Sequence, residues 1–159
     1  MNTVLVTGVL FYAVALGFAA CPFKVKVTRV ARCKSNVNSI FEVPEHPIVA
    51  FTDTCEVTVD GCVHYKDEVK SMNLSIKALK NGIPVLRTTA RACGFKSGKF
   101  VVNCPVPKDS DMCAGKERFK VPGGSAVIQF LVGRIGGTVD VITDKGVFCY
   151  EAEGVVSRA

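Results

Sequence analysis

Short runs of β-branched and aromatic residues alternate with turn residues along most of this chain. No helical spacing of apolar positions extends for any length after residue 20. Frequent short strands separated by turns are typical of β-sandwiches. We therefore predict an all-β sandwich with minimal helix content. The predicted strands are residues 24–32, 48–54, 56–59, 69–79, 83–92, 100–102, 119–121, 126–134, 139–143 and 147–156.

Turn residues separate several of these strands. Asn81-Gly82 is typical of a tight hairpin turn. The glycine-rich stretch 133–137 invites comparison with a phosphate-binding loop, but such a loop opens a helix. A β-rich run follows here, so we interpret the stretch as a hairpin turn. The last three strands are separated by Pro122-Gly123-Gly124, Gly136-Gly137 and Asp144-Lys145-Gly146.

The alternation is clearest in residues 69–79. Side chains along a strand point to opposite faces, so one face of this strand is predicted to be solvated and the other buried. The glycosylation sequon Asn73-Leu74-Ser75 places Asn73 on the polar face, where a glycan would have to be. The polar positions are Ser71, Asn73, Ser75 and Lys77, and the apolar positions are Met72, Leu74, Ile76 and Ala78.

The N-terminal part of the chain has the pattern of a secretory signal. Residues 4–20 form an apolar run of 17 residues that ends in small residues. A bilayer-spanning helix needs about 20, so we interpret residues 1–19 as a cleaved signal peptide. Residues 20–159 are then predicted to form a single domain. We expect the mature protein to be secreted, with the lysosome as the alternative destination.

All eight cysteines lie beyond the predicted signal. An even number of cysteines in a secreted chain is typical of a disulfide framework, here four bonds. Zinc sites use short Cys-x-x-Cys pairs, and this sequence has none. We therefore predict disulfides and no metal. The residues alone leave the pairing open, since eight cysteines allow about 105 arrangements.

The chain is moderately basic, with a formal net charge of +6. This charge is consistent with an ordinary solvated surface. It is also consistent with attraction to an anionic membrane, worth about 1 kcal/mol per basic residue near the surface. Nucleic acid is not an expected partner, because a secreted protein does not meet it.

Catalytic chemistry requires oriented groups in one site, and the candidates are few. His46 lies between turn residues and His64 lies beside a cysteine, and neither belongs to a nucleophile motif. Asp109 and Asp111 lack the ligand series of a calcium loop. We predict that the protein is not an enzyme and needs no cofactor.

Two segments resemble the ML lipid-recognition family, which includes the Niemann-Pick type C2 sterol carriers. Residues 93–109 contain Cys93, the Lys96-Ser97-Gly98 turn and Cys104-Pro105, and a late strand contains Phe148-Cys149-Tyr150-Glu151. Gly82-Ile83-Pro84-Val85 is similar to the family's Gly-Val-Pro-Val. The resemblance extends from about Cys33 to the C-terminus.

This resemblance implies an immunoglobulin-like β-sandwich of two antiparallel sheets, with a lipid tail in an apolar cavity between them. It also implies a disulfide arrangement. The implied pairs are Cys33–Cys149, Cys55–Cys62 and Cys93–Cys104, which leaves Cys21 with Cys113.

We therefore expect a monomer that binds a sterol, a fatty acid or a phospholipid and transfers it. The alternatives are a recognition protein that presents lipid to a receptor or acts as an immune co-receptor, and a non-catalytic activator of a lipid hydrolase. Lys96, Lys99 and Lys108 are candidates for contact with an anionic membrane. The candidate cavity walls, each of which could instead be ordinary core, are Met72, Leu74, Ile76, Ile128, Phe130, Val132, Phe148 and Tyr150.

Overall fold

The computed structural model describes residues 20–34 and 38–159. The signal peptide predicted for residues 1–19 lies outside these described residues. Within them the chain is mostly β-strand, with one short helix. The elements are β1 (Phe23–Arg32), β2 (Phe41–Glu42), β3 (Ile48–Phe51), β4 (Val57–Asp60), β5 (Cys62–Tyr65), β6 (Met72–Lys80), β7 (Ile83–Arg91), β8 (Lys96–Ser97), β9 (Phe100–Val101), β10 (Ser110–Cys113), β11 (Arg118–Phe119), α2 (Gly124–Phe130), β12 (Gly133–Thr143) and β13 (Gly146–Arg158).

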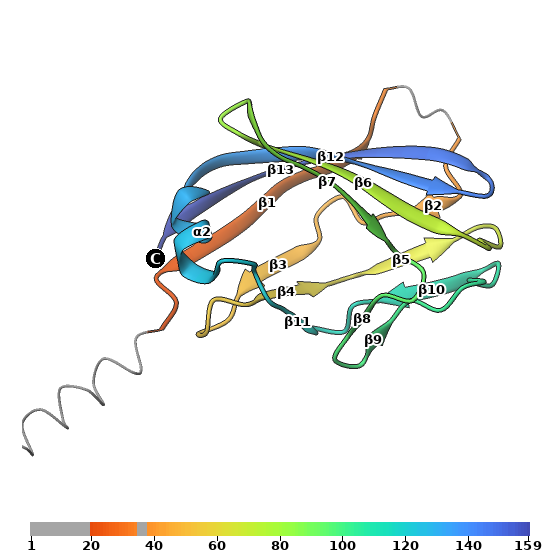
Figure 1. Ribbon diagram of the computed structural model, residues 1–159, viewed down its shortest axis with the longest axis horizontal. Coiled ribbons are helices and arrows are strands. Elements are labelled where there is room, and N and C mark those ends of the chain that lie inside the picture. The colour runs from red at the N-terminus through yellow and green to blue at the C-terminus, as the bar shows by residue number, and fades with distance from the viewer. Residues whose placement is uncertain (1–19, 35–37) are drawn as a thin grey trace, which may run out of the picture.

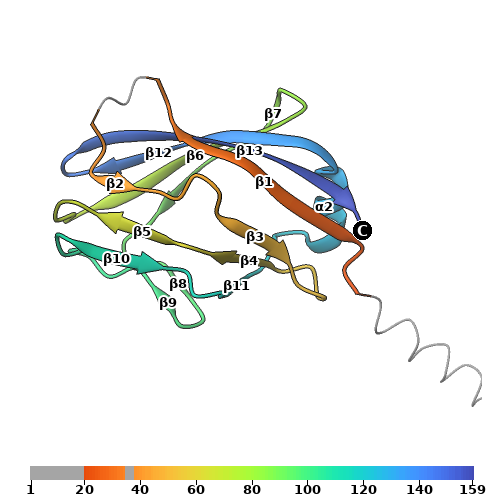
Figure 2. The same cartoon turned by 180° about the vertical axis from the view of Figure 1, so that it is seen from behind.

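The strands pair antiparallel in several sheets. The largest has the order β1-β13-β12-β6-β7. Two three-stranded sheets have the orders β10-β5-β2 and β11-β4-β3, and β8 pairs with β9. The five-stranded sheet forms one layer, and the smaller sheets lie against one of its two faces, as Figures 1 and 2 show from opposite directions.

The register of the five-stranded sheet identifies its covered face. Paired residues on neighbouring strands point to the same face, and residues two apart on a strand share a face. Phe148 is buried among residues of other sheets, so its row lies on the covered side. We call this side the inner face and the opposite side the outer face. Successive rows of the inner face are Phe148–Val141–Leu74, Tyr150–Val139–Ile76 and Ala152–Gly137–Ala78.

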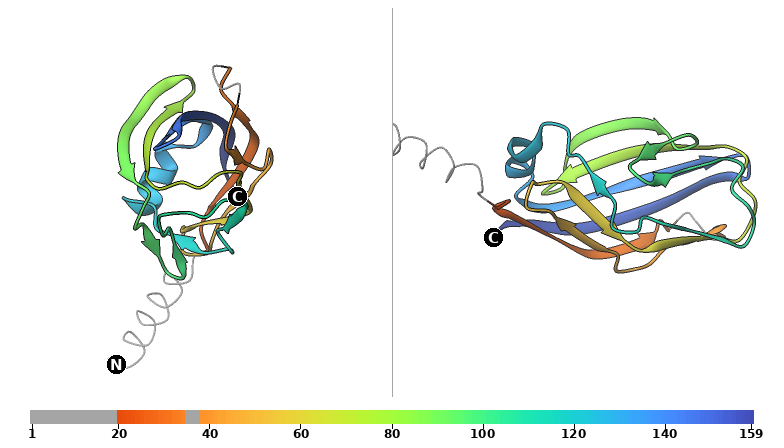
Figure 3. Two further views of the ribbon diagram at one scale, coloured as in Figure 1. Left: turned by 90° about the vertical axis from the view of Figure 1, so that its right-hand side faces the viewer. Right: turned by 90° about the horizontal axis from the view of Figure 1, so that it is seen from below.

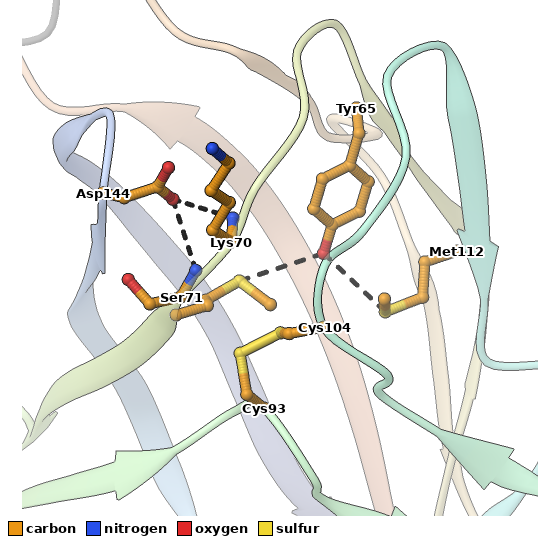
Figure 4. The surroundings of a disulfide bond; sticks show 8 residues. Tyr65, Lys70, Ser71, Cys93, Cys104, Met112 and Asp144 are labelled. Carbon is orange, nitrogen blue, oxygen red and sulfur yellow. Dashed lines mark hydrogen bonds between the residues drawn. A yellow bond between two sulfur atoms is a disulfide. The ribbon is translucent and has the colours of Figure 1, made fainter.

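A first core cluster packs against one end of the inner face. The Phe41 ring makes edge-to-face contacts with Tyr65 and Phe148, at centroid distances of 5.1 and 5.5 Å. The Tyr65 hydroxyl lies 3.9 Å from the Met72 sulfur. Figure 4 shows the Cys93–Cys104 disulfide beside Tyr65, whose hydroxyl is joined by dashed lines to sulfur atoms. The buried members of the cluster are Phe41, Tyr65, Val69, Met72, Ala92, Val102, Val106 and Phe148.

A second core cluster lies at the other end of the sheet, where α2 meets β1 and β13 (Figure 3). Its buried members are Phe23, Ile128 and Val156. The two core clusters share no buried residue among those described. The packed interior is therefore divided into two parts along the length of the five-stranded sheet.

The strand predicted for residues 126–134 is wrong, because α2 occupies most of this segment. Ile128 and the C-cap residue Leu131 are spaced i and i+3, so the helix turns both towards the second core cluster, and Val132 packs against the same cluster just after the helix ends. The alternation of Ile128, Phe130 and Val132 that suggested a strand does not describe one face. Phe130 points away from the cluster and is 56% exposed.

The hairpin turn predicted for residues 133–137 is also wrong. These residues lie in β12, which pairs with β13 on one side and β6 on the other. Gly136 and Gly137 are not at a bend. They are positions where the neighbouring strands leave little room for a side chain, so glycine here reflects close strand approach.

The hairpin predicted at Asn81-Gly82 is confirmed, since the turn connects β6 and β7. Asn81 has a φ of 50° and Gly82 a φ of 81°. Two-residue hairpin turns require such positive angles, which asparagine and glycine tolerate best. At the start of β6, Met72 is buried and Asn73 is exposed, as the alternation predicted, but every residue from Leu74 to Lys80 is half-buried, so the predicted contrast between the two faces does not continue along the strand.

Strand β7 forms one edge of the five-stranded sheet. All nine of its residues are exposed. Ile83 and Leu86 are the most exposed of its large apolar side chains, at 67% and 51%. The smaller sheets therefore cover the five-stranded sheet less completely at β7 than around Phe148.

All eight cysteines form disulfides. The implied pairs Cys33–Cys149 and Cys93–Cys104 are present. The implied pairs Cys55–Cys62 and Cys21–Cys113 are wrong, because Cys21 bonds to Cys55 and Cys62 to Cys113.

Strand β4 explains the incorrect pairing. It runs between Cys55 and Cys62, and an extended chain advances about 3.3 Å per residue. A disulfide needs Cα atoms within about 7 Å, so the strand holds these two cysteines apart. Cys62 instead lies directly opposite Cys113 in the β5–β10 register, with a Cα–Cα distance of 4.0 Å.

Candidate functional site

An apolar pocket of about 320 Å³ lies on the inner face of the five-stranded sheet, and we refer to it as the apolar pocket. Four strands contribute to it: β1, β6, β12 and β13. Ten of the lining residues lie on the inner face, either in the rows given above or at adjoining positions of the same strands. They are Val27, Val30, Ile76, Ala78, Ile135, Gly137, Val139, Tyr150, Ala152 and Gly154.

Charged residues also border the apolar pocket, but their side chains belong to the other face. Lys77, Thr138 and Glu151 form one row of the sheet, a single residue out of phase with the inner-face rows. Neighbouring residues of a strand point to opposite faces. These residues therefore present backbone to the pocket, and the side chains that line it are hydrocarbon apart from the Tyr150 hydroxyl.

Small residues form the floor of the apolar pocket. Gly137 of β12 lies between Ala78 of β6 and Ala152 of β13 in one row. In the adjoining row, Gly154 pairs with Ile135 and with Val27. Rows of larger side chains would reach further from the sheet, so the hollow exists because these positions carry a methyl group or only hydrogen.

The apolar pocket lies outside both core clusters. Ile76, Ala78 and Val139 line it and belong to neither cluster. Their neighbours Leu74 and Val141 pack against the first core cluster, and Ile135 packs against the second. The inner face is thus packed towards both ends and hollow between them.

Tyr150 is fixed at the boundary between the first core cluster and the apolar pocket. Its hydroxyl makes hydrogen bonds with the Ser39 hydroxyl and, at 3.3 Å, with the backbone oxygen of Phe41. Burial raises the pKa of Tyr150, and the Ser39 hydrogen bond opposes that shift. The ring is therefore a neutral, rigid wall of the pocket.

The predicted wall residues are divided among several locations. Only Ile76 and Tyr150 line the apolar pocket. Met72, Leu74 and Phe148 belong to or pack against the first core cluster. Ile128 and Val132 belong to or pack against the second. Phe130 is exposed on α2, with the Lys80 ammonium 4.5 Å from its ring centroid.

The predicted basic residues do not border the apolar pocket. Lys96, Lys99 and Lys108 are all exposed, on and after β8. Lys99 lines a different hollow beside β9 and β10. The structure brings none of these three lysines to the apolar pocket.

The sequence reasoning missed most of the site. On β12 the apolar alternation Ile135, Gly137, Val139, Val141 was available as a signal. The interpretation of Gly136-Gly137 as a turn concealed it. Ala152 and Gly154 carry too little apolar surface to be recognised as pocket residues without the strand register.

A larger hollow of about 630 Å³ lies on the outer face. Arg134, Glu151 and Glu153 are among its lining residues. Charged side chains of both signs make this hollow a solvated surface, and it is a poor match for an apolar molecule.

The two histidines differ in their surroundings. His64 Nδ1 lies 2.8 Å from an Asp111 carboxylate oxygen, across the β5–β10 pair. His46 is exposed in the segment between β2 and β3. Within residues 20–34 and 38–159, no three or more His, Cys, Asp or Glu residues are grouped so that they could hold a metal ion. In the same ranges no helix has the length and apolar character needed to cross a bilayer.

No family model matches this chain, and no curated protein matches it. The resemblance to the ML lipid-recognition family therefore rests on the motif residues of the sequence.

Proposed function

We propose that this protein is a secreted lipid-binding protein of the ML type, which holds an apolar tail against the inner face of the five-stranded sheet. The observation that carries the proposal is the apolar pocket with its floor of Ala78, Gly137 and Ala152. Protein interiors are normally close-packed. A hollow with a hydrocarbon wall between two packed clusters is the arrangement that a lipid tail would fill.

On this proposal the two layers form an immunoglobulin-like sandwich, and the apolar pocket is the cavity between its sheets. Two disulfides, Cys33–Cys149 and Cys93–Cys104, are among the four pairs expected from the ML resemblance, and the other two expected pairs do not form. The two that form support the proposal because the first links β13 to the end of β1 and the second closes the segment that carries the Lys96-Ser97-Gly98 turn.

The energetics suit reversible transfer. Burial of about ten methylene groups contributes roughly 8 kcal/mol relative to water. Association costs about 4–15 kcal/mol, so measurable but moderate affinity is expected. A lipid that leaves a bilayer exchanges one apolar environment for another, so the free-energy difference between the bilayer-bound and the protein-bound lipid is small and transfer can proceed in either direction.

The disulfides also bear on location. Four disulfides in one chain indicate an oxidising compartment, as extracellular proteins have. We propose that the protein is exported and acts without catalysis, by binding lipid and transferring it.

The test fills the apolar pocket. Ala78→Leu adds a larger side chain to its floor, and Ala126→Leu adds the same side chain to the exposed face of α2. The readout is uptake of the neutral fluorescent probe N-phenyl-1-naphthylamine. We expect Ala78→Leu to weaken uptake about tenfold or more while the free energy of unfolding is maintained, and Ala126→Leu to leave uptake unchanged.

Native mass spectrometry of the purified protein provides an independent measurement, because co-purified lipid would appear as a mass increment. Absence of probe uptake together with absence of bound lipid would contradict the proposal. Equal uptake by Ala78→Leu and the unchanged protein would show that the probe binds elsewhere.

A further inference from the structure

A second hollow, of about 490 Å³, adjoins the apolar pocket. Val30 and Tyr150 line both. The second hollow differs in chemistry, because four charged residues contribute to it, and we refer to it as the charged pocket. Its lining residues are Val30, Ala31, Arg32, Phe41, Glu42, Val43, Glu45, Lys66 and Tyr150.

Two of the four charges compensate each other. Lys66 Nζ lies 3.0 Å from a Glu42 carboxylate oxygen. The hydrogen bond from Lys66 and its positive charge lower the pKa of Glu42, so this carboxylate is ionised at neutral pH and matches the ammonium group. The pair leaves little net charge for a ligand to meet.

Arg32 is the cation that remains available. Its side chain is exposed, and no ion-pair partner for it occurs among residues 20–34 and 38–159. Arg32 lies directly opposite Tyr150 in the β1–β13 register, so both side chains leave the sheet on the inner face. The charges of Arg32 and Lys66 also reach the Tyr150 hydroxyl, where they oppose the rise in its pKa caused by burial.

We propose that the charged pocket binds the anionic head group of an amphiphile whose tail lies in the apolar pocket, and that Arg32 holds this head group. The inference rests on the proposed lipid-binding function and narrows it. A guanidinium group binds a carboxylate through two parallel hydrogen bonds, which gives both strength and orientation. A sterol hydroxyl or an uncharged alcohol cannot make this pair.

Glu45 further restricts which anionic head groups the charged pocket can bind. It belongs to the same lining, and its side chain has no ion-pair partner in the described part of the chain. A head group with several negative charges would be repelled by Glu45, whereas a single charge can face Arg32. The lipid class that we infer is a fatty acid, the simplest amphiphile that joins one carboxylate to an apolar tail.

The test compares two ligands with the same tail. Dodecanoic acid and dodecanol, both below their aggregation limits, displace N-phenyl-1-naphthylamine at neutral pH. We expect the acid to bind about tenfold or more tightly than the alcohol, since a charged hydrogen-bonded pair is available only to the acid. Arg32→Gln should lower the affinity for the acid to that for the alcohol and leave the affinity for the alcohol unchanged. Arg32→Lys should keep part of the preference.

Arg158→Gln is the matched control, because Arg158 is an exposed arginine at the end of β13 and lines neither pocket. It should leave both affinities unchanged. Thermal unfolding of each variant checks that the fold is intact.

Equal affinity for acid and alcohol in the unchanged protein would overturn the role of Arg32 while retaining lipid binding. An acid preference that survives Arg32→Gln would overturn it as well and direct attention to Lys66. Failure of both ligands to displace the probe, or failure of the probe to bind, would overturn the proposed function itself.

Discussion

A Cβ atom on Gly137 would lie 2.3 Å from the backbone oxygen of Lys77 on the neighbouring strand, a distance that no side chain tolerates. Gly137→Ala must therefore push β12 and β6 apart. Overpacking of this kind typically costs about 1–3 kcal/mol. We expect a loss of that size in urea unfolding.

Gly136→Ala is the control at the adjacent position, where the nearest atom to a new Cβ would be the Ala152 oxygen at 3.3 Å. This variant should lose clearly less stability. Equal losses for the two variants would mean that glycine is needed along β12 for its backbone freedom and not for close strand approach.

The disulfides should differ in their contribution to stability. Cys33–Cys149 closes 116 residues and Cys93–Cys104 closes 11. In the chain-entropy treatment the long loop contributes about 5 kcal/mol and the short loop about 3 kcal/mol. Replacing each pair by serines should lower the free energy of unfolding, and the loss should be larger for Cys33–Cys149 than for Cys93–Cys104.

Non-reducing peptide mapping should find Cys62–Cys113 and Cys21–Cys55. A peptide that contains a Cys55–Cys62 disulfide would contradict this arrangement.

Tyr65 should make the protein sensitive to alkali. Burial raises its pKa above the ordinary value of 10.0. The folded state then keeps the phenol proton where the unfolded state has lost it, so stability is complete below about pH 10 and falls as the pH rises further. Tyr65→Phe should flatten this decline in urea unfolding. An unchanged alkaline slope would assign the effect to Tyr150, whose pKa burial also raises.

Asp144 should contribute to stability against acid. Burial acts to raise its pKa, but hydrogen bonds from the backbone amides of Lys70 and Ser71 outweigh it, and the pKa is lowered from 3.8 (Figure 4). Stability from this group is present above its ordinary pKa and is lost as the pH falls through the lowered value. Asp144→Asn should therefore reduce stability at neutral pH and flatten the acid decline. Asp53→Asn, at an exposed carboxylate, should do neither.

Asn73 should carry a glycan when the protein is expressed in a eukaryotic secretory system. It begins the sequon Asn73-Leu74-Ser75 and is exposed on β6. Glycosidase treatment should reduce the mass of the protein, and Ser75→Ala should abolish that change. An unshifted mass in the unchanged protein would show that this strand position is not used.

The chain's strand content and its β6–β7 hairpin could be predicted from the sequence, because both depend on local signals. Alternation in residues 69–79 and the Asn81-Gly82 turn each act within a few residues. The segment around Ile128 could not be assigned in this way. Its apolar positions satisfy a strand spacing and a helix spacing together, and only packing against Phe23 and Val156 selects the helix.

The candidate site was harder to predict for a different reason. Its defining residues, Ala78, Gly137 and Ala152, are notable for the side-chain volume that they lack. Their alignment in one row depends on the pairing of three strands that are far apart in sequence. Large apolar residues such as Phe148 and Ile128 give a stronger signal in the sequence, but they fill the two core clusters on either side of the pocket.

Strand β7, which is exposed along its whole length, has two features that disfavour self-association. An open strand edge offers unpaired amide and carbonyl groups to any other chain, which favours aggregation. Pro84 removes one amide donor from that edge, and Arg87 and Arg91 would bring like charges together if two copies met there. The missing amide donor and the repulsion between these arginines both disfavour pairing of two copies along β7, although this edge of the largest sheet is uncovered.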